Sequence, residues 1–198
     1  MGKGRLEAFS DGVLAIIITI MVLELRVPHG DDLASLVPLI PKLLSYVLSF
    51  VYLAIYWNNH HHMLHATHKV TGSILWANMH LLFWLSLVPF ATGWMGENRF
   101  APVPTALYGV PLLMAAIAYW ILQRAILNAE GADSVLAHAV GDDLKGKGSI
   151  LLYVAALFLA FLHPALARAI YVFVALVWLI PDRRIERALA EHEKRSRA

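Results

Sequence analysis

Long apolar runs separated by short polar stretches dominate the chain. Most of the runs approach the roughly 20 residues that a helix needs to cross a bilayer. They predict six spanning helices, over residues 6–27, 38–57, 73–94, 103–127, 149–162 and 164–180. The last two are short and are separated only by His163-Pro164, which predicts a tight helical hairpin because proline ends one helix and can open the next. One long buried segment is the competing interpretation of that region.

Composition places these runs in a membrane. The 198 residues are 59% hydrophobic and 15% charged, with a mean hydropathy of +0.62, whereas a soluble domain of this size needs more polar surface. The first run is longer than the apolar core of a secretory signal, and no small-residue cleavage site follows it. We therefore expect an all-α integral membrane protein with one domain over residues 1–198, a cytoplasmic loop at 128–148 and a charged C-terminal tail at 182–198.

Basic residues predict the orientation in the membrane. Twelve of the 16 Lys and Arg residues fall on one side of the predicted topology (Lys3, Arg5, Lys69, Arg124, Lys145, Lys147, Arg183, Arg184, Arg187, Lys194, Arg195 and Arg197), and four fall on the other (Arg26, Lys42, Arg99 and Arg168). Cytoplasmic loops carry such an excess. We expect a multi-pass protein of the cell membrane with both termini cytoplasmic. The net charge of +2 gives no reason to expect a nucleic-acid partner.

The first predicted helix has two different faces. At about 100° per residue, Gly12, Ile16, Ile20 and Leu23 fall on one stripe with Thr19 at its flank, while Asp11 points to nearly the opposite side. Periodicity alone is equally consistent with a stripe that packs on other helices or lipid. A carboxylate near the hydrocarbon boundary needs a partner or a use, although an Asp that only caps the helix is the simpler alternative.

Several motifs in the first three predicted spans resemble one family. Arg5-x-x-x-Phe9-Ser10-Asp11, followed by Ile16, Thr19 and Leu23, is similar to the first-helix signature of the endo-lysosomal potassium channel family, transmembrane protein 175. Downstream stand Trp57-x-x-His60, Leu75-x-x-Asn78-x-x-x-Leu82 and Pro89-Phe90-x-Thr92. The last three spans resemble the family only in hydropathy and length.

The resemblance implies a potassium-preferring channel. Short bacterial members assemble as homotetramers around a central pore lined by the first helix, which assigns Ile16, Thr19, Ile20 and Leu23 to the pore and Ile16 to a hydrophobic constriction that acts as the gate. Potassium is the expected permeant ion, and no cofactor is expected. The sequence contains no Thr-Val-Gly-Tyr-Gly run whose carbonyls could replace the hydration shell. Selectivity is then expected from constriction size and hydration cost.

The family pattern also implies a structural polar network. Its expected members are Arg5, Phe9, Ser10, Asp11, Trp57, His60, Trp76 and Asn78. The Asp11 carboxylate is expected to accept hydrogen bonds from neighbouring spans, with Arg5, His60, Trp76 or Asn78 among its partners. Because an unpaired polar group in hydrocarbon costs several kcal/mol, such a network would fix the rotation of the first helix.

A histidine cluster between the second and third spans permits other chemistry. It runs from His60 to His68, and His61 and His65 are spaced to share a transition metal on a helix. No carboxylate close in sequence completes a set, so we expect no metal site; solvent-facing histidines could instead confer pH sensitivity. A proton-coupled or metal-ion transporter that uses membrane-embedded His and Asp residues is the alternative function. We expect no enzyme, because no nucleophile stands with a base at a credible spacing and no His-Glu-x-x-His motif occurs.

Overall fold

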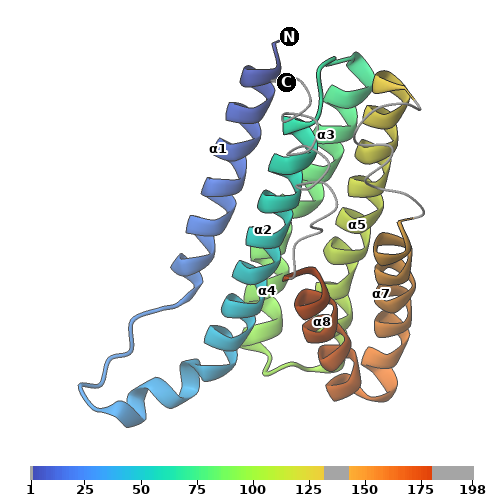
Figure 1. Cartoon of the computed structure of the whole chain (residues 1–198). Coiled ribbons are helices and arrows are strands. Elements are labelled where there is room, and N and C mark those ends of the chain that lie inside the picture. The colour runs from blue at the N-terminus through green and yellow to red at the C-terminus, as the bar shows by residue number, and fades with distance from the viewer. Residues whose placement is uncertain (1, 132–142, 180–198) are drawn as a thin grey trace.

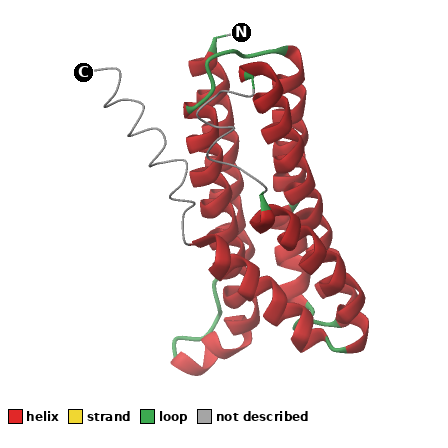
Figure 2. Ribbon diagram, turned by 45° about the vertical axis from the view of Figure 1, so that its right-hand side comes forward, coloured by secondary structure: helices red, strands yellow, loops and turns green. Residues whose placement is uncertain are grey.

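The computed structural model describes residues 2–131 and 143–179, and every regular element in these ranges is a helix (Figures 1 and 2). The prediction of an all-helical fold is confirmed. The elements are α1 (Lys3–Met21), η1 (Val22–Glu24), η2 (Leu33–Leu39), α2 (Ile40–His65), α3 (Gly72–Ser86), α4 (Val88–Glu97), α5 (Pro102–Glu130), α7 (Leu144–Leu162) and α8 (Pro164–Leu179).

Five helical segments of the described chain are long and apolar enough to cross a membrane. They cover Lys3–Glu24, Leu33–His65, Gly72–Glu97, Pro102–Glu130 and Leu144–Leu162. The sixth predicted span corresponds to α8, an apolar helix of 16 residues in the described range. Its length falls below what a perpendicular crossing needs, so six membrane crossings remain a prediction.

The third predicted span consists of two helices. α3 ends at Ser86 and α4 begins at Val88, with Leu87 as a turn between them. Pro89 lies in the first turn of α4, where its missing N–H removes a hydrogen bond to the preceding turn. The span predicted over residues 73–94 is matched by the apolar segment Gly72–Glu97, with a one-residue turn inside it.

The chain reverses direction between α7 and α8. His163 leaves the helical conformation at φ −144° and ψ 82°, and its backbone N–H still donates to the carbonyl of Leu159 at 2.7 Å. α8 begins directly at Pro164, and the two helices pack side by side. The structure therefore has the predicted helical hairpin, and one continuous buried segment is excluded.

The loop expected at residues 128–148 is shorter than predicted. α5 continues to Glu130 and α7 already begins at Leu144. The Asp143 carboxylate caps α7 by accepting from the backbone N–H of Gly146 at 3.1 Å, which a cap residue does for the otherwise unpaired first turn. The predicted tail at 182–198 and the middle of this loop lie outside the described residues.

The helices run alternately up and down, which separates the ends of the bundle (Figure 1). At one end the Lys3 Nζ donates to the carbonyl of His65 at 2.6 Å, and Glu130 accepts from the backbone N–H of Lys69 at 2.9 Å. At the other end Lys42 forms an ion pair with Glu97 at 2.8 Å. Lys3 and Lys69 therefore lie at one end of the described bundle and Lys42 at the other, while the orientation in the membrane stays a prediction.

Two clusters of buried side chains form the core. One joins α1, α2, α3 and α5 around residues such as Leu14 and Leu81. The other joins α2, α4, α5, α7 and α8, and it combines buried tyrosines with alanines such as Ala156 and Ala160. Small residues let helix backbones approach closely, which is how helices associate where lipid removes the hydrophobic driving force.

α4 packs tightly against α2 at Gly96, and we expect Gly96→Ala to destabilise the protein. A Cβ at this position would lie 2.6 Å from Ser45 Oγ and 2.8 Å from the Cα of Lys42. Because the second atom belongs to the backbone, the helices must separate, at a cost of about 1–3 kcal/mol. Thermal unfolding in detergent measures the effect. The control is Gly148→Ala in α7, where nothing lies within 4 Å; equal stability of the two variants would contradict the prediction.

Candidate functional site

One face of α1 packs against the rest of the bundle. Its buried residues are Leu6, Ser10, Leu14, Ile17 and Met21, and they contact α2, α3 and α4. The three- and four-residue spacing of these positions is that of one helix face. The remaining faces of α1 are uncovered in the single chain, and Figure 1 shows the helix at the edge of the bundle.

The uncovered side of α1 carries the aliphatic stripe predicted from the sequence. Ile16 is 59% exposed, Ile20 is 45% exposed, and Leu23, which lies in η1, is 75% exposed. Thr19 is also exposed, and its hydroxyl lies within hydrogen-bond distance of the carbonyls of Ala15 at 2.9 Å and Ile16 at 3.0 Å. The Thr19 proton is thus used within the helix, while the oxygen can still accept a hydrogen bond from the exposed side.

Three buried side chains connect α1, α2 and α3. The Asn78 amide nitrogen donates to Ser10 Oγ at 2.9 Å, and the Asn78 amide oxygen lies 2.7 Å from His60 Nε2. The Ser10 hydroxyl donates a hydrogen bond to the carbonyl of Leu6 at 2.8 Å. With this amide orientation the His60 Nε2 carries the proton, because an amide oxygen only accepts. We call this set the Ser10–Asn78–His60 chain; it links α1 to α3 and α3 to α2.

Asp11 bonds Trp57, another predicted member of the network. Its carboxylate accepts from Trp57 Nε1 at 2.9 Å, rather than from Arg5, His60, Trp76 or Asn78. The reason is geometric: Asp11 lies about 100° further round the helix than Ser10, so it faces the edge of α2 while Ser10 faces α3. The hydrogen bond between Asp11 and Trp57 is therefore a separate contact between α1 and α2. It is not part of the Ser10–Asn78–His60 chain.

The other predicted network members lie apart from these contacts. Arg5 and Phe9 are exposed, and Trp76 is 79% exposed. Within the described part of the chain, none of the three forms a side-chain hydrogen bond with Asp11 or with the Ser10–Asn78–His60 chain. Their membership of the network stays a prediction.

The histidine cluster continues α2 instead of forming a loop. His61 is exposed and stacks between Trp57 and His65, with ring centroids 6.1 Å away on each side. Beyond the helix, His68 Nδ1 lies 3.2 Å from a carboxylate oxygen of Glu130, an acidic neighbour that sequence proximity does not reveal. Among residues 2–131 and 143–179, no three potential His, Cys, Asp or Glu ligands come together as a metal site.

A buried hydroxyl cluster had not been predicted. Ser49 Oγ of α2 lies 2.6 Å from Thr92 Oγ1 of α4 and 3.0 Å from the hydroxyl of Tyr108 of α5. Thr92 belongs to the third-span motif, but Ser49 and Tyr108 were not singled out. Ser45 and Ser49, four residues apart in an apolar helix, were the available signal, because they place two hydroxyls on one face.

Comparison with known proteins identifies the family. The family model described as "Endosomal/lysosomal potassium channel TMEM175" matches residues 5–89. A potassium channel of Chryseobacterium sp. (strain P1-3) is 57% identical over 192 residues, covering 97% of this chain and 100% of that protein. The endosomal/lysosomal proton channel TMEM175 of Homo sapiens is 32% identical over 103 residues, covering 46% of this chain and 20% of the human protein.

A solved structure supports the same relationship. The crystal structure of a lysosomal potassium-selective channel TMEM175 homolog from Chamaesiphon minutus matches with a TM-score of 0.77 and 28% identity, covering 91% of this chain and 97% of that one. Sequence motifs, fold and near-complete coverage of a relative all agree. This chain belongs to the TMEM175 family.

Proposed function

We propose that this chain forms a potassium-preferring cation channel of the cell membrane and catalyses no reaction. The observation that carries the proposal is the uncovered aliphatic stripe of α1, Ile16, Ile20 and Leu23, in a chain with several membrane-length helices. Relatives named as potassium channels support the choice of ion. No cofactor is required, since the permeant K⁺ is the cargo.

The pore requires several copies of the chain. One α1 helix offers a stripe but encloses no volume, so a pore along it needs a closed ring of identical subunits. We assign four subunits, from the family resemblance, with α1 of each lining the axis. Ile16 forms the constriction, Ile20 and Leu23 continue the apolar wall, and Thr19 supplies a polar oxygen between them.

An apolar constriction controls ion passage by letting water in or keeping it out, and it does not coordinate the ion. A ring of isoleucine side chains offers no oxygen to a cation, so the ion passes only while the ring is wide enough to stay wet. Slight narrowing expels the water and closes the path. Such a ring favours the ion that gives up its hydration shell more readily, and this is the basis that we assign to potassium preference.

The polar contacts of α1 set the geometry of that ring. Ser10 is buried on the face that turns away from Ile16, and its bond to Asn78 anchors the helix. Because helix rotation by one position moves each side chain through about 100°, a lost anchor would turn Ile16 away from the axis. The alternative transporter function has less support, because His60 is paired with Asn78 and His80 with Trp84 at 2.9 Å.

Bi-ionic recording tests the proposal. Purified protein in a planar bilayer, with K⁺ on one side, Na⁺ on the other and equal pH, is expected to carry a current whose reversal potential has the sign of potassium preference. Equal pH matters because the human relative is named for protons. Chemical cross-linking in the same bilayers is expected to give a covalent tetramer as its largest product. A reversal potential of zero or a current-free protein would contradict the function, and a dimeric end point would contradict the pore.

A further inference from the structure

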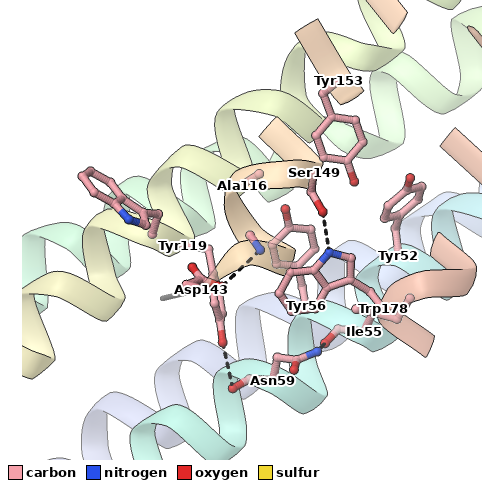
Figure 3. A pocket seen from close by; sticks show the side chains of 12 residues that line it. Tyr52, Ile55, Tyr56, Asn59, Ala116, Tyr119, Asp143, Ser149, Tyr153 and Trp178 are labelled. Carbon is pink, nitrogen blue, oxygen red and sulfur yellow. Dashed lines mark hydrogen bonds between the residues drawn. The ribbon is translucent and has the colours of Figure 1, made fainter. Parts of the chain in front are cut away.

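α2 presents two different faces. At about 100° per residue, Trp57, His61 and His65 fall on one face, and this face lies beside α1 because Trp57 bonds Asp11 there. The nearly opposite face borders the aromatic cavity between α2, α5, α7 and α8. Figure 3 shows this cavity, and its lining residues from α2 are Tyr52, Ile55, Tyr56 and Asn59.

Two histidine rings on the face beside α1 are exposed. His61 and His65 are four residues apart, and their ring centroids are separated by 6.1 Å with an interplanar angle of 19°. A four-residue step places two side chains one above the other on a helix. Because exposed side chains change rotamer readily, each ring can turn one nitrogen toward a common point between them.

Two contacts fix the register of α1 against α2. The helices run in opposite directions (Figure 1). Trp57 Nε1 donates to the Asp11 carboxylate at 2.9 Å, and Lys3 Nζ donates to the carbonyl of His65 at 2.6 Å. The eight residues between the two contact positions on α1 therefore lie alongside the eight residues between those on α2.

Glu7 occupies the middle of this register. It lies four residues from either contact position on α1, and His61 lies four residues from either contact position on α2, so Glu7 is placed beside His61. The Glu7 carboxylate lies 3.9 Å from Lys3 Nζ, and a pair of this kind near the surface is weak. Among residues 2–131 and 143–179 no three potential ligands form a set, so Glu7 contributes nearby charge instead of a third bond. No carboxylate stands close to these histidines in the sequence, and the fold supplies this one from α1.

This combination suits a divalent transition metal ion. Two imidazoles at positions i and i+4 of a helix are the pair that binds zinc in the His-Glu-x-x-His motif. Imidazole nitrogen favours Ni²⁺, Cu²⁺ and Zn²⁺, whereas Mg²⁺ and Ca²⁺ take oxygen ligands. A nearby carboxylate attracts the doubly charged ion, and water can complete its coordination.

We infer that His61 and His65 bind one divalent transition metal ion of the Ni²⁺, Cu²⁺ and Zn²⁺ class, with Glu7 of α1 as its charge partner. At about 100° per residue, Glu7 lies on nearly the opposite side of α1 from Ile16. The metal site is thus separate from the stripe assigned to the pore, and its occupancy does not depend on the proposed channel activity.

Calorimetric titration of the full-length, untagged protein in maltoside micelles with NiCl₂ tests the inference. We expect saturable binding of about one Ni²⁺ per chain, which a large excess of Mg²⁺ does not displace. His61→Gln and His65→Gln are each expected to raise the dissociation constant at least about tenfold. Glu7→Gln keeps the size of the side chain but removes its charge, and it is expected to raise the dissociation constant roughly threefold.

Matched histidine variants show whether the pair itself is the site. His29→Gln removes an exposed histidine outside α2, and His68→Gln removes the one that lies 3.2 Å from Glu130; both should leave Ni²⁺ binding unchanged. Because His61 and His65 are exposed, their variants should also unfold at the native temperature, which separates a lost ligand from a lost fold.

Four results would overturn the inference. They are the absence of saturable Ni²⁺ binding, displacement of Ni²⁺ by Mg²⁺, native affinity in His61→Gln or His65→Gln, and loss of binding in His68→Gln. Native affinity in Glu7→Gln would overturn the part assigned to α1. The comparison of Ni²⁺ with Mg²⁺ uses the native chain and is decisive even where a variant fails to fold.

Discussion

An Ile16→Asn channel is expected to pass more current than the native channel and to distinguish potassium from sodium less well. Ile16 is uncovered in the single chain, and in the proposed tetramer four copies narrow the pore. An amide at this position hydrogen-bonds water and holds the constriction wet, which removes the hydration penalty that the apolar ring imposes. Each tenfold rise in conductance would correspond to a barrier lower by about 1.4 kcal/mol.

Single-channel recording under bi-ionic conditions measures both effects. The matched control is Val22→Asn, which introduces the same polar group at an exposed position off the stripe and should leave conductance and reversal potential close to native. If Ile16→Asn and Val22→Asn behave alike, Ile16 does not form the constriction. If only the conductance changes, the constriction is confirmed but selectivity arises elsewhere along the pore.

Asn78→Ala is expected to give the largest loss of stability. Asn78 is fully buried and bonds both Ser10 and His60. Truncation leaves the buried His60 Nε2 without its partner, removes one of the two hydrogen bonds of Ser10 and opens a small void, at a combined cost of about 2–4 kcal/mol. Because the same bonds fix the rotation of α1, assembly into the tetramer should fail along with folding stability.

Unfolding in detergent measures the loss of stability, and size-exclusion chromatography measures the loss of tetramer assembly. Asn98→Ala serves as the control, since the Asn98 amide also donates one hydrogen bond, to the backbone carbonyl of Trp94 at 2.8 Å, but is exposed. In a double-mutant cycle, Ser10→Ala and Asn78→Ala should be clearly non-additive because they remove the same contact. Additive effects, or a fully assembled and stable Asn78→Ala protein, would show that the chain of hydrogen bonds does not hold α1.

Much of the fold followed from hydropathy because membrane helices need apolar length and little else. The hairpin at His163-Pro164 was predictable, since proline punctuates helices strongly. Pro89 carried the same kind of signal for the break between α3 and α4. It was overlooked because Leu87 in the turn and Val88 directly after it are as apolar as the helices themselves.

The ends of the helices were harder to predict than their centres. α2 continues eight residues beyond Trp57 to His65, through asparagines and histidines that end the apolar run. Backbone hydrogen bonds do not require apolar side chains, so hydropathy underestimates helix length wherever a helix leaves the hydrocarbon. Trp57, which the sequence places at the end of a span, therefore lies inside α2, where it bonds Asp11.

The partners of Asp11 could not be predicted from one helix. The angular position of Asp11 follows from the sequence, but which neighbour meets it depends on how α2 and α3 pack against α1. Ser10, one position earlier, proved to hold the buried contact. The stripe of Ile16, Ile20 and Leu23 required only the helical period, which explains why its exposure on one side agrees with the sequence.

The unequal lengths of α5 and α7 shape the lipid around the protein. α5 has 29 residues and α7 has 19, which correspond to about 43 Å and about 28 Å. Trp120 and Asp143 line the same cavity, so α7 begins level with Trp120, about 15 Å short of the end of α5 at Glu130. Asp143, Lys145 and Lys147 cannot remain in acyl chains without water or headgroups. A bilayer that meets these side chains has its surface lower beside α7 than beside the end of α5, and a thicker membrane would be mismatched more strongly at α7 than at α5.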